Sequence, residues 1–245
     1  MQARSRLILL GAFTLAVGLI VFFPARVAYH WFAPPSVKIS GIQGSVWNGS
    51  AREGSARGVY FRDLRWQVRP LQFLSGKFGV AIKANPVPGF LEGNVAIGFG
   101  GTLIVTDLVG SLSLESLRQA IGVPGLSGNL SVRLEHLRLE NGLPVIAVGN
   151  MQVADLVAPI VHRASIGGYK VDFLAQEVGI VASIEDTDGV VDLAGSLRLS
   201  DDRHYVFTAL LAAKANTPEE IRQQLHFLGS ANEHGQYELR LEGQL

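Results

Sequence analysis

The stretch Val190-Val-Asp-Leu-Ala-Gly-Ser-Leu-Arg-Leu-Ser200 decides the fold, together with Asp201-Asp-Arg-His-Tyr-Val-Phe-Thr-Ala-Leu-Leu-Ala-Ala213, which follows it directly. In each half, apolar residues recur at every second position, which is the pattern of a β-strand with one buried face. These residues are Val191, Leu193, Leu197 and Leu199, and then Tyr205, Phe207, Ala209 and Leu211. The polar pair Asp201-Asp202 lies between the halves, so the stretch predicts a β-hairpin.

The same period of two dominates the chain after Val37. It recurs at Leu130, Val132 and Leu134, and near the end of the chain at Tyr237, Leu239 and Leu241. Between Leu134 and Leu137 the alternation changes face, which a one-residue β-bulge explains. Asn141-Gly142 adds a strong turn signal. We therefore predict a mainly β protein, built as a curved antiparallel sheet with one or two short helices.

Two segments depart from the strand pattern. Residues Thr217 to Leu228 predict a helix: Thr217 and Glu220 have capping-box spacing, Pro218 fits the first helical position, and Gly229 follows the end. Ile221, Leu225 and Leu228 would share its apolar face. A shorter helix is predicted from a Ser113 cap through Leu114, Leu117 and Ile121 to Gly122, and one helical turn is expected over Pro70 to Gly76.

Near the start of the chain, the run from Leu7 to Phe23 carries no charged residue. A membrane-spanning helix needs about 20 mostly apolar residues, so residues 7–25 predict a transmembrane anchor. A cleaved signal peptide is the alternative, because Arg4 and Arg6 precede the run. The run exceeds the usual length of a signal peptide's apolar segment, and bulky residues such as Tyr29 and Trp31 follow it. These two aromatic residues also suit the lipid headgroup layer.

This anchor sets the predicted domain organisation. Residues 1–6 would be cytoplasmic, residues 7–25 the anchor, residues 26–36 a juxtamembrane segment and residues 37–245 an exported β-rich domain. Within the anchor, Gly11, Thr14 and Gly18 recur at i, i+3 and i+7. This spacing places small residues along one helix face, where a second membrane helix can pack closely.

Composition and motifs exclude several classes of function. The formal net charge is +0, so the chain has no basic field for nucleic acid. With no cysteine, disulfides, thiolate zinc sites and cysteine nucleophiles are ruled out. Zinc-protease, phosphate-loop and nucleophile-elbow motifs are missing, and the histidines lack ligand spacing. We expect no cofactor, no metal site and no enzyme activity, although two distant carboxylates that pair in space would escape a reading of sequence.

Three segments carry a resemblance to a known family. The first is Ile39-Ser-Gly-Ile-Gln-Gly-Ser-Val-Trp-Asn-Gly-Ser-Ala51, the second runs from Leu64 to Lys77, and the third ends the chain at Leu225 to Gly243. In this order behind an anchor, they resemble protein N of the type II (general) secretion system. The motif residues are Gly41, Gly44, Val46, Trp47, Gly49, Trp66 and Pro70. We interpret them as structural, since glycine permits tight turns and tryptophan supplies apolar bulk.

The resemblance implies a single-pass protein of the Gram-negative inner membrane, with most of the chain in the periplasm. It implies a non-catalytic accessory subunit of the inner-membrane platform that supports export of folded proteins, with subunits C, L and M as neighbours. The first motif alone is also similar to exported β-groove proteins of the AsmA type. The alternative function is therefore a periplasmic lipid-binding or lipid-transfer module, with an acyl chain on the apolar face of the sheet.

Overall fold

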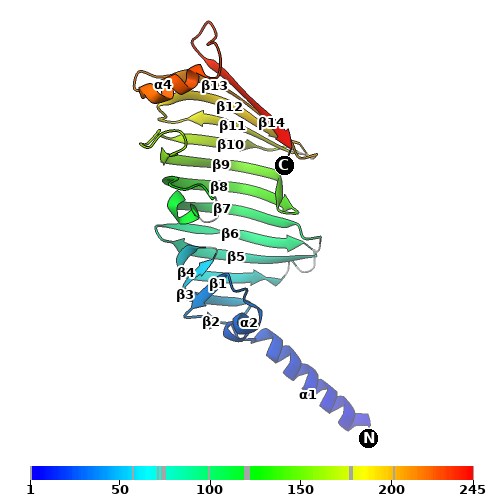
Figure 1. Cartoon of the computed structure of the whole chain (residues 1–245). Helices are drawn as coiled ribbons and strands as arrows, with labels where there is room; N and C mark the ends of the chain where they lie inside the picture. The colour runs from blue at the N-terminus through cyan, green and yellow to red at the C-terminus, as the bar shows by residue number, and fades with distance from the viewer. Residues whose placement is uncertain are drawn as a thin grey trace.

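A computed structural model describes residues 2–56, 58–70, 72, 76–98, 100–118, 122–176, 179–200 and 202–244, with the backbone alone for residues 2–9 and 16. Its main feature is one 14-stranded antiparallel sheet. From β3 onward each strand pairs with its neighbours in the chain, so the strands are stacked like the rungs of a ladder (Figure 1). The predicted mainly β fold with one large antiparallel sheet is confirmed.

The elements have the following bounds. The helices are α1 (Gln2–Val21), α2 (Ala25–Phe32), the 3-10 helix η2 (Leu114–Leu117) and α4 (Glu219–His226). The first seven strands are β1 (Val37–Ser40), β2 (Gln43–Gly44), β3 (Asn48–Ala56), β4 (Val59–Arg69), β5 (Lys77–Pro86), β6 (Gly89–Gly98) and β7 (Leu103–Ser113). The remaining strands are β8 (Ser127–Glu140), β9 (Leu143–Val157), β10 (Tyr169–Leu174), β11 (Ile180–Asp186), β12 (Val191–Leu199), β13 (His204–Ala213) and β14 (Tyr237–Gln244).

The two faces of the sheet differ in polarity. One row of paired residues crosses from β6 to β14 with small or apolar side chains throughout: Leu91, Gly110, Val132, Met151, Val171, Ile184, Gly195, Ala209 and Leu239. The adjacent row points to the other face and is mostly polar: Glu92, Val109, Arg133, Asn150, Asp172, Ser183, Ser196, Thr208 and Arg240. We call the first side the apolar face.

The predicted hairpin and bulge are both confirmed. β12 and β13 pair in antiparallel register, and the Ser200 N–H donates to the His204 carbonyl at 2.9 Å across the turn. Asn141 and Gly142 have φ values of 53° and 81°, as a two-residue hairpin turn requires. The register between β8 and β9 shifts between Leu134 and His136, which is the bulge.

Aspartates occupy the irregular points of three long strands. Asp63, Asp107 and Asp155 have φ values of 50°, 53° and 52°, in the left-handed region that aspartate tolerates better than most residues. Asn85 donates to the Asp63 carboxylate at 3.5 Å, and Asn94 donates to the Asp107 carboxylate at 3.0 Å. At Asp63 the register shifts against β5, so the strand keeps its apolar residues on one face on both sides of the irregularity.

Both helices predicted within residues 37–245 form, but the bounds and the cap of the second differ from the prediction. The expected helix from Thr217 to Leu228 is shorter, because α4 covers Glu219–His226, and Leu228 is 39% exposed. The predicted capping box is wrong: the N-cap residue is Pro218, and no side chain caps it. The Thr217 hydroxyl instead donates to the Val190 carbonyl and accepts from the Lys214 N–H, which ties the helix start to the sheet.

The Ser113 cap is confirmed, since its hydroxyl accepts from the Glu115 N–H. The helix after it begins as the 3-10 turn η2 and continues into Arg118, whose carbonyl accepts from the Gly122 N–H at 2.9 Å. Ile121 and most of the turn expected over Pro70 to Gly76 lie outside the described residues. The apolar run near the start does form the helix α1. Searched over the described residues only, the structure contains no helix that is long and apolar enough to span a membrane.

The helices cover part of the apolar face. Ile221 and Leu225 of α4 pack with Ile166, Val191 and Leu211. In the same way, Leu114 of η2 packs with Leu112 and Leu130. No large side chain among the described residues is fully buried, so the core is a series of separate clusters along the sheet.

A buried ion pair fastens the start of α4 to the sheet. The Asp186 side chain, 8% exposed, pairs with Lys214 and accepts from the Leu193 N–H at 2.9 Å. Burial by itself raises the pKa of the Asp186 carboxyl, but the hydrogen bonds from Lys214 and Leu193 outweigh burial and hold the pKa below its usual value. A depressed carboxyl pKa stabilises the fold at neutral pH.

We predict that Asp186→Asn lowers the free energy of unfolding at pH 7 by about 1–3 kcal/mol, because the partly exposed Lys214 loses its charged partner and the hydrogen bonds to a buried carboxylate are weakened. In the unsubstituted protein this stabilisation is complete above the unfolded-state pKa, near 4, and is lost as the pH falls through the lower folded-state pKa. Denaturant unfolding between pH 7 and pH 3 measures both effects. The exposed Asp192→Asn is the matched control, and equal acid sensitivity of all three proteins would contradict the assignment.

Candidate functional site

The motif residues converge where the N-terminal helices meet the base of the sheet. Figure 1 shows α1 projecting from the end of the ladder that holds β1, β2 and β3, with α2 lying against that end. We call this region the helix–sheet junction and define it by residues 20–29, residues 37–51 and Trp66. It is the place in the described structure where the predicted motif residues act together.

Backbone and tryptophan hydrogen bonds join the end of α1 to the motif. The Val46 N–H donates to the Phe23 carbonyl at 3.0 Å, and Pro24 and Ser45 form a β-bridge. The Trp47 indole N–H donates to the Ile20 carbonyl at 2.7 Å. The Ile20 carbonyl also accepts from the Phe23 N–H at 3.3 Å, so Trp47 adds a second donor at the end of α1, where carbonyls lack regular helical partners. Val46 and Trp47 therefore bind the end of α1 through hydrogen bonds.

One side of α2 is fixed to the sheet. Arg26 donates through Nε to the Ile42 carbonyl at 2.8 Å. The Tyr29 hydroxyl donates to the Val37 carbonyl at 3.1 Å and accepts from the Ile39 N–H at 2.9 Å. Ala25 is buried with Ile42 and Ala51. The expectation that Tyr29 lies in the headgroup layer stays a prediction; in the structure its hydroxyl is bound to β1.

Each motif glycine is needed at its position for a different steric reason. Gly41 and Gly44 have φ values of 66° and 85°, which side chains rarely adopt. At Gly49 the backbone is extended, but a Cβ would lie 2.3 Å from the Trp66 ring, its partner on β4. Trp66 thus packs over Gly49 and donates its indole N–H to the Val46 carbonyl at 3.2 Å. Trp66 therefore holds the segment from Val46 to Gly49, whose own Trp47 bonds α1.

A carboxylate ties the neighbouring strands together. Glu53 accepts from the Tyr60 hydroxyl at 2.7 Å and from the Ser40 hydroxyl at 3.1 Å. These hydrogen bonds, first from Tyr60 and then from Ser40, hold the pKa of the Glu53 carboxyl below its usual value. Strands β1, β3 and β4 are therefore linked by side chains as well as by the backbone ladder.

The remaining predicted residues lie outside the junction. Pro70 follows the last residue of β4. On α1, the space around a Cβ at Gly11 or Gly18 is open, and Thr14 donates to the Leu10 carbonyl at 2.9 Å. Their predicted role in helix packing stays a prediction. Arg26 and Tyr29 were not singled out as sheet contacts, although Ala25, Arg26 and Tyr29 have the spacing of one helical face.

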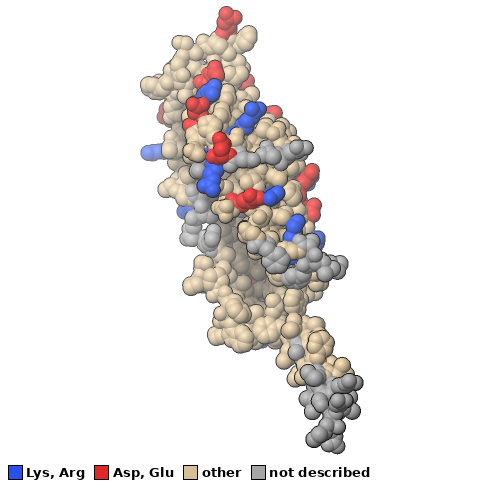
Figure 2. Space-filling view, turned by 90° about the vertical axis from the view of Figure 1, so that its right-hand side faces the viewer, with Lys and Arg blue, Asp and Glu red and all other residues tan. Residues whose placement is uncertain are grey.

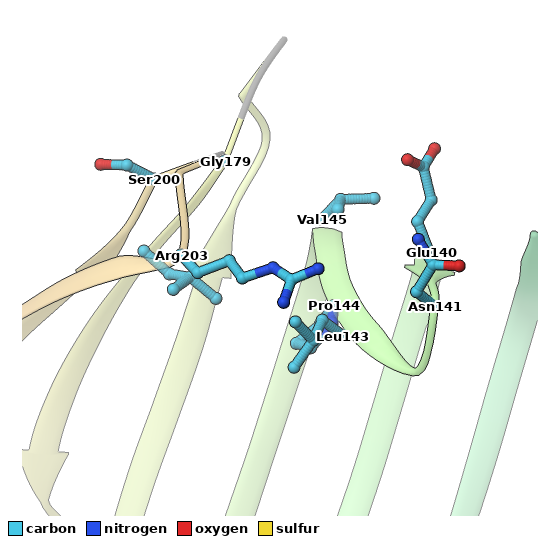
Figure 3. A pocket seen from close by; sticks show the side chains of 9 residues that line it. Glu140, Asn141, Leu143, Pro144, Val145, Gly179, Ser200 and Arg203 are labelled. Carbon is cyan, nitrogen blue, oxygen red and sulfur yellow. The ribbon is translucent and has the colours of Figure 1, made fainter. Parts of the chain in front are cut away.

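A separate hollow lies between the β8–β9 turn and the ends of β11 to β13. Its volume is about 120 Å³, and Leu143, Pro144 and Leu199 contribute apolar walls. Figure 3 shows the Arg203 side chain extending toward Leu143 and Pro144, with Glu140 on the far side of the turn. Glu140 is paired with Arg138. No nucleophile and base face each other among the residues that line this hollow.

The surface charges are mixed. Figure 2 shows lysine, arginine, aspartate and glutamate interspersed over the upper part of one side, and few charges on the lower part nearer α1. Among the residues that the structure describes, no three side chains of the metal-binding types converge. The junction is thus the best candidate site, and its geometry is suited to mechanical attachment.

We predict that Gly49→Ala destabilises the junction by about 1–3 kcal/mol, because the new methyl group overlaps the Trp66 ring and overpacks it. Gly100→Ala is the matched control, since nothing lies within 4 Å of a Cβ there. Thermal unfolding and tryptophan fluorescence of both variants measure the difference. Equal unfolding temperatures for Gly49→Ala and Gly100→Ala would show that the Gly49–Trp66 contact contributes nothing.

Comparison with known proteins identifies the family. The profile described as "Type II secretion system (T2SS), protein N" matches residues 35–240. The chain is 25% identical over 247 residues to the Type II secretion system protein N of Vibrio cholerae, covering 97% of each chain. It is 23% identical over 236 residues to the protein of that name from Aeromonas hydrophila, covering 93% of each. No solved structure matches significantly. Because the matched region spans most of the chain, this protein belongs to the type II secretion system protein N family.

Proposed function

We propose that the protein is a non-catalytic accessory subunit of the inner-membrane platform of the type II secretion system. In this proposal residues 1–6 are cytoplasmic, residues 7–25 cross the inner membrane, residues 26–36 lie at its surface and residues 37–245 stand in the periplasm. Family membership supports the role in secretion. The localisation rests on the uncharged run from Leu7 to Phe23.

The observation that carries the proposal is the helix–sheet junction. The end of α1 is hydrogen-bonded to the motif, and α2 is bonded to β1 and to Ile42. These hydrogen bonds fix α1 and α2 relative to the sheet, so the helices form a rigid base for it. With neighbouring strands about 4.8 Å apart, the sheet would carry its last strand about 60 Å from its first. The anchored end and the free end are then available to different partners.

The role is tested by deleting the gene and measuring release of exported proteins into the medium. We expect release to fall, and we expect the full-length protein to co-purify from detergent-solubilised membranes with platform subunits of the C, L and M type. Amino-terminal sequencing of the purified protein distinguishes an intact anchor from a cleaved signal peptide. Normal release together with no recovered secretion subunit would overturn the proposal.

A separate prediction concerns the packing of α1 against membrane helices of other subunits. We expect Gly11→Leu combined with Gly18→Leu to keep α1 inserted but to weaken association with other platform subunits, because large side chains prevent close approach of helices. Co-purification yield measures association, and resistance to alkaline extraction measures insertion. Leu10→Ala combined with Val17→Ala is the control on the same helix. Unchanged co-purification would leave α1 as a membrane tether only.

A second candidate function is favoured by the apolar face. Exposed apolar side chains remain on or beside the sheet, including Phe78 at 40%, Ile97 at 51% and Leu241 at 50%. Large exposed apolar patches mark binding surfaces for proteins, membranes or ligands. We infer from this that a lipid acyl chain is the competing ligand, as in an AsmA-like lipid-binding module. Mass spectra of native and delipidated preparations that are identical would count against it.

A further inference from the structure

A group of aromatic rings, most of them exposed, lies just before α2 and at its C-terminal end. Trp31 is 66% exposed, Phe32 is 77% exposed, and Phe22, just before α2, is 78% exposed. The Trp31 ring lies 5.9 Å from the Phe23 ring and 6.3 Å from the Phe32 ring, measured between centroids. We call Phe22, Phe23, Trp31 and Phe32 the aromatic ridge. It lies directly where α1 ends.

Beside α2 lies a shallow hollow with basic walls. Arg26, His30 and Arg52 are among the residues that line it, and no aspartate or glutamate is among them. Arg26, whose Nε bonds the Ile42 carbonyl, and His30 lie on α2 beside this hollow. A short helix with aromatic residues at its end and basic residues along its flank has the pattern of a helix that lies in a membrane surface.

We propose that α2 is a foot that rests on the phospholipid surface, with the aromatic ridge at the headgroup level and Arg26 and Arg52 facing lipid phosphates. Tryptophan and phenylalanine partition favourably into this layer, and arginine binds phosphate through several N–H donors. In water the same rings would leave an apolar patch exposed to solvent, which is energetically unfavourable. This inference rests on the proposed function, because it takes the end of α1 to mark the membrane boundary.

The foot has a structural consequence for the whole sheet. The Tyr29 hydroxyl, the Arg26 Nε and buried Ala25 fix α2 to β1 and to residues 42–51. A bilayer that holds Trp31 and Phe32 therefore also holds the base of the sheet. The inclination of the 14-stranded sheet to the membrane is then set by α2, because α1 alone leaves rotation about its axis free.

The test uses the absence of cysteine from the natural chain, which allows one fluorescent label per protein. Full-length Phe32→Cys, Leu15→Cys and Glu238→Cys are labelled with NBD and reconstituted in vesicles of phosphatidylethanolamine and phosphatidylglycerol. All three natural side chains are exposed on the isolated chain, so labelling should not disturb folding. Leu15 reports insertion of α1, and Glu238 on β14 reports a site far from the membrane.

We expect the label at position 32 to emit at shorter wavelength than the label at position 238. We also expect spin-labelled lipids carrying a shallow probe to quench it more strongly than those carrying a deep probe. The label at position 15 should be quenched more strongly by the deep probe. A water-like label at position 32 overturns the foot, whatever the label at position 15 reports. A water-like label at position 15 is a failure of the anchor in the proposed function, so the two failures are distinguishable.

A second variant separates the aromatic ridge from the anchor. Trp31→Ser in the Phe32→Cys protein is expected to shift the label toward water while α1 stays resistant to alkaline extraction. Energy transfer from a donor at position 238 to acceptor lipids should then report a broader spread of distances, because the sheet has lost its fixed inclination. Identical depth and distance distributions with and without Trp31 would show that the ridge does not bind the membrane surface.

Discussion

The pairing of each strand with its neighbours in the chain is the constraint on which the rest of the structure depends. Side chains on a strand alternate between the two faces, so a ladder of this kind keeps one row apolar and the next polar across many strands. The rows through Val132 and through Arg133 illustrate this from β6 to β14. A slip of one residue in any pair would exchange the two faces, so the irregularities stand at defined positions, such as Asp63 in β4 and the bulge between Leu134 and His136 in β8.

A sheet organised in this way does not close upon itself to form one central core. Its contacts are mostly between neighbouring strands, and the buried residues form separate clusters under α4, under η2 and at the junction. Stability is then distributed along the ladder, as in repeat proteins where each unit is stabilised by the next. The uncovered part of the apolar face is the structural reason that a lipid remains a competing ligand.

The helix–sheet junction links this sheet to the apolar N-terminal helix α1. Gly41, Gly44 and Gly49 allow the backbone to approach and turn, and Trp66 packs against the space that Gly49 leaves. Through Trp47, Tyr29 and Arg26 the same region holds both N-terminal helices. In a secretion-system subunit, such an attachment would transmit the position of α1 to a sheet reaching about 60 Å away.

Alternation and turn chemistry in the sequence were sufficient to predict the mainly β fold, the hairpin at Ser200 to His204, the bulge near Leu134 and the existence of α4, because these features depend on neighbours in the chain. The Thr217 cap was predicted wrongly, since its hydroxyl donates to the carbonyl of Val190, just before β12 and 27 positions earlier in the chain. The turn role predicted for the motif glycines holds for Gly41 and Gly44, which have positive φ values, but not for Gly49, where the Trp66 ring occupies the space of a side chain. That Trp66 lies over Gly49, that Tyr29 is bound to β1 and that Trp31 stays exposed were decided only by tertiary structure, because each depends on segments brought together by strand pairing.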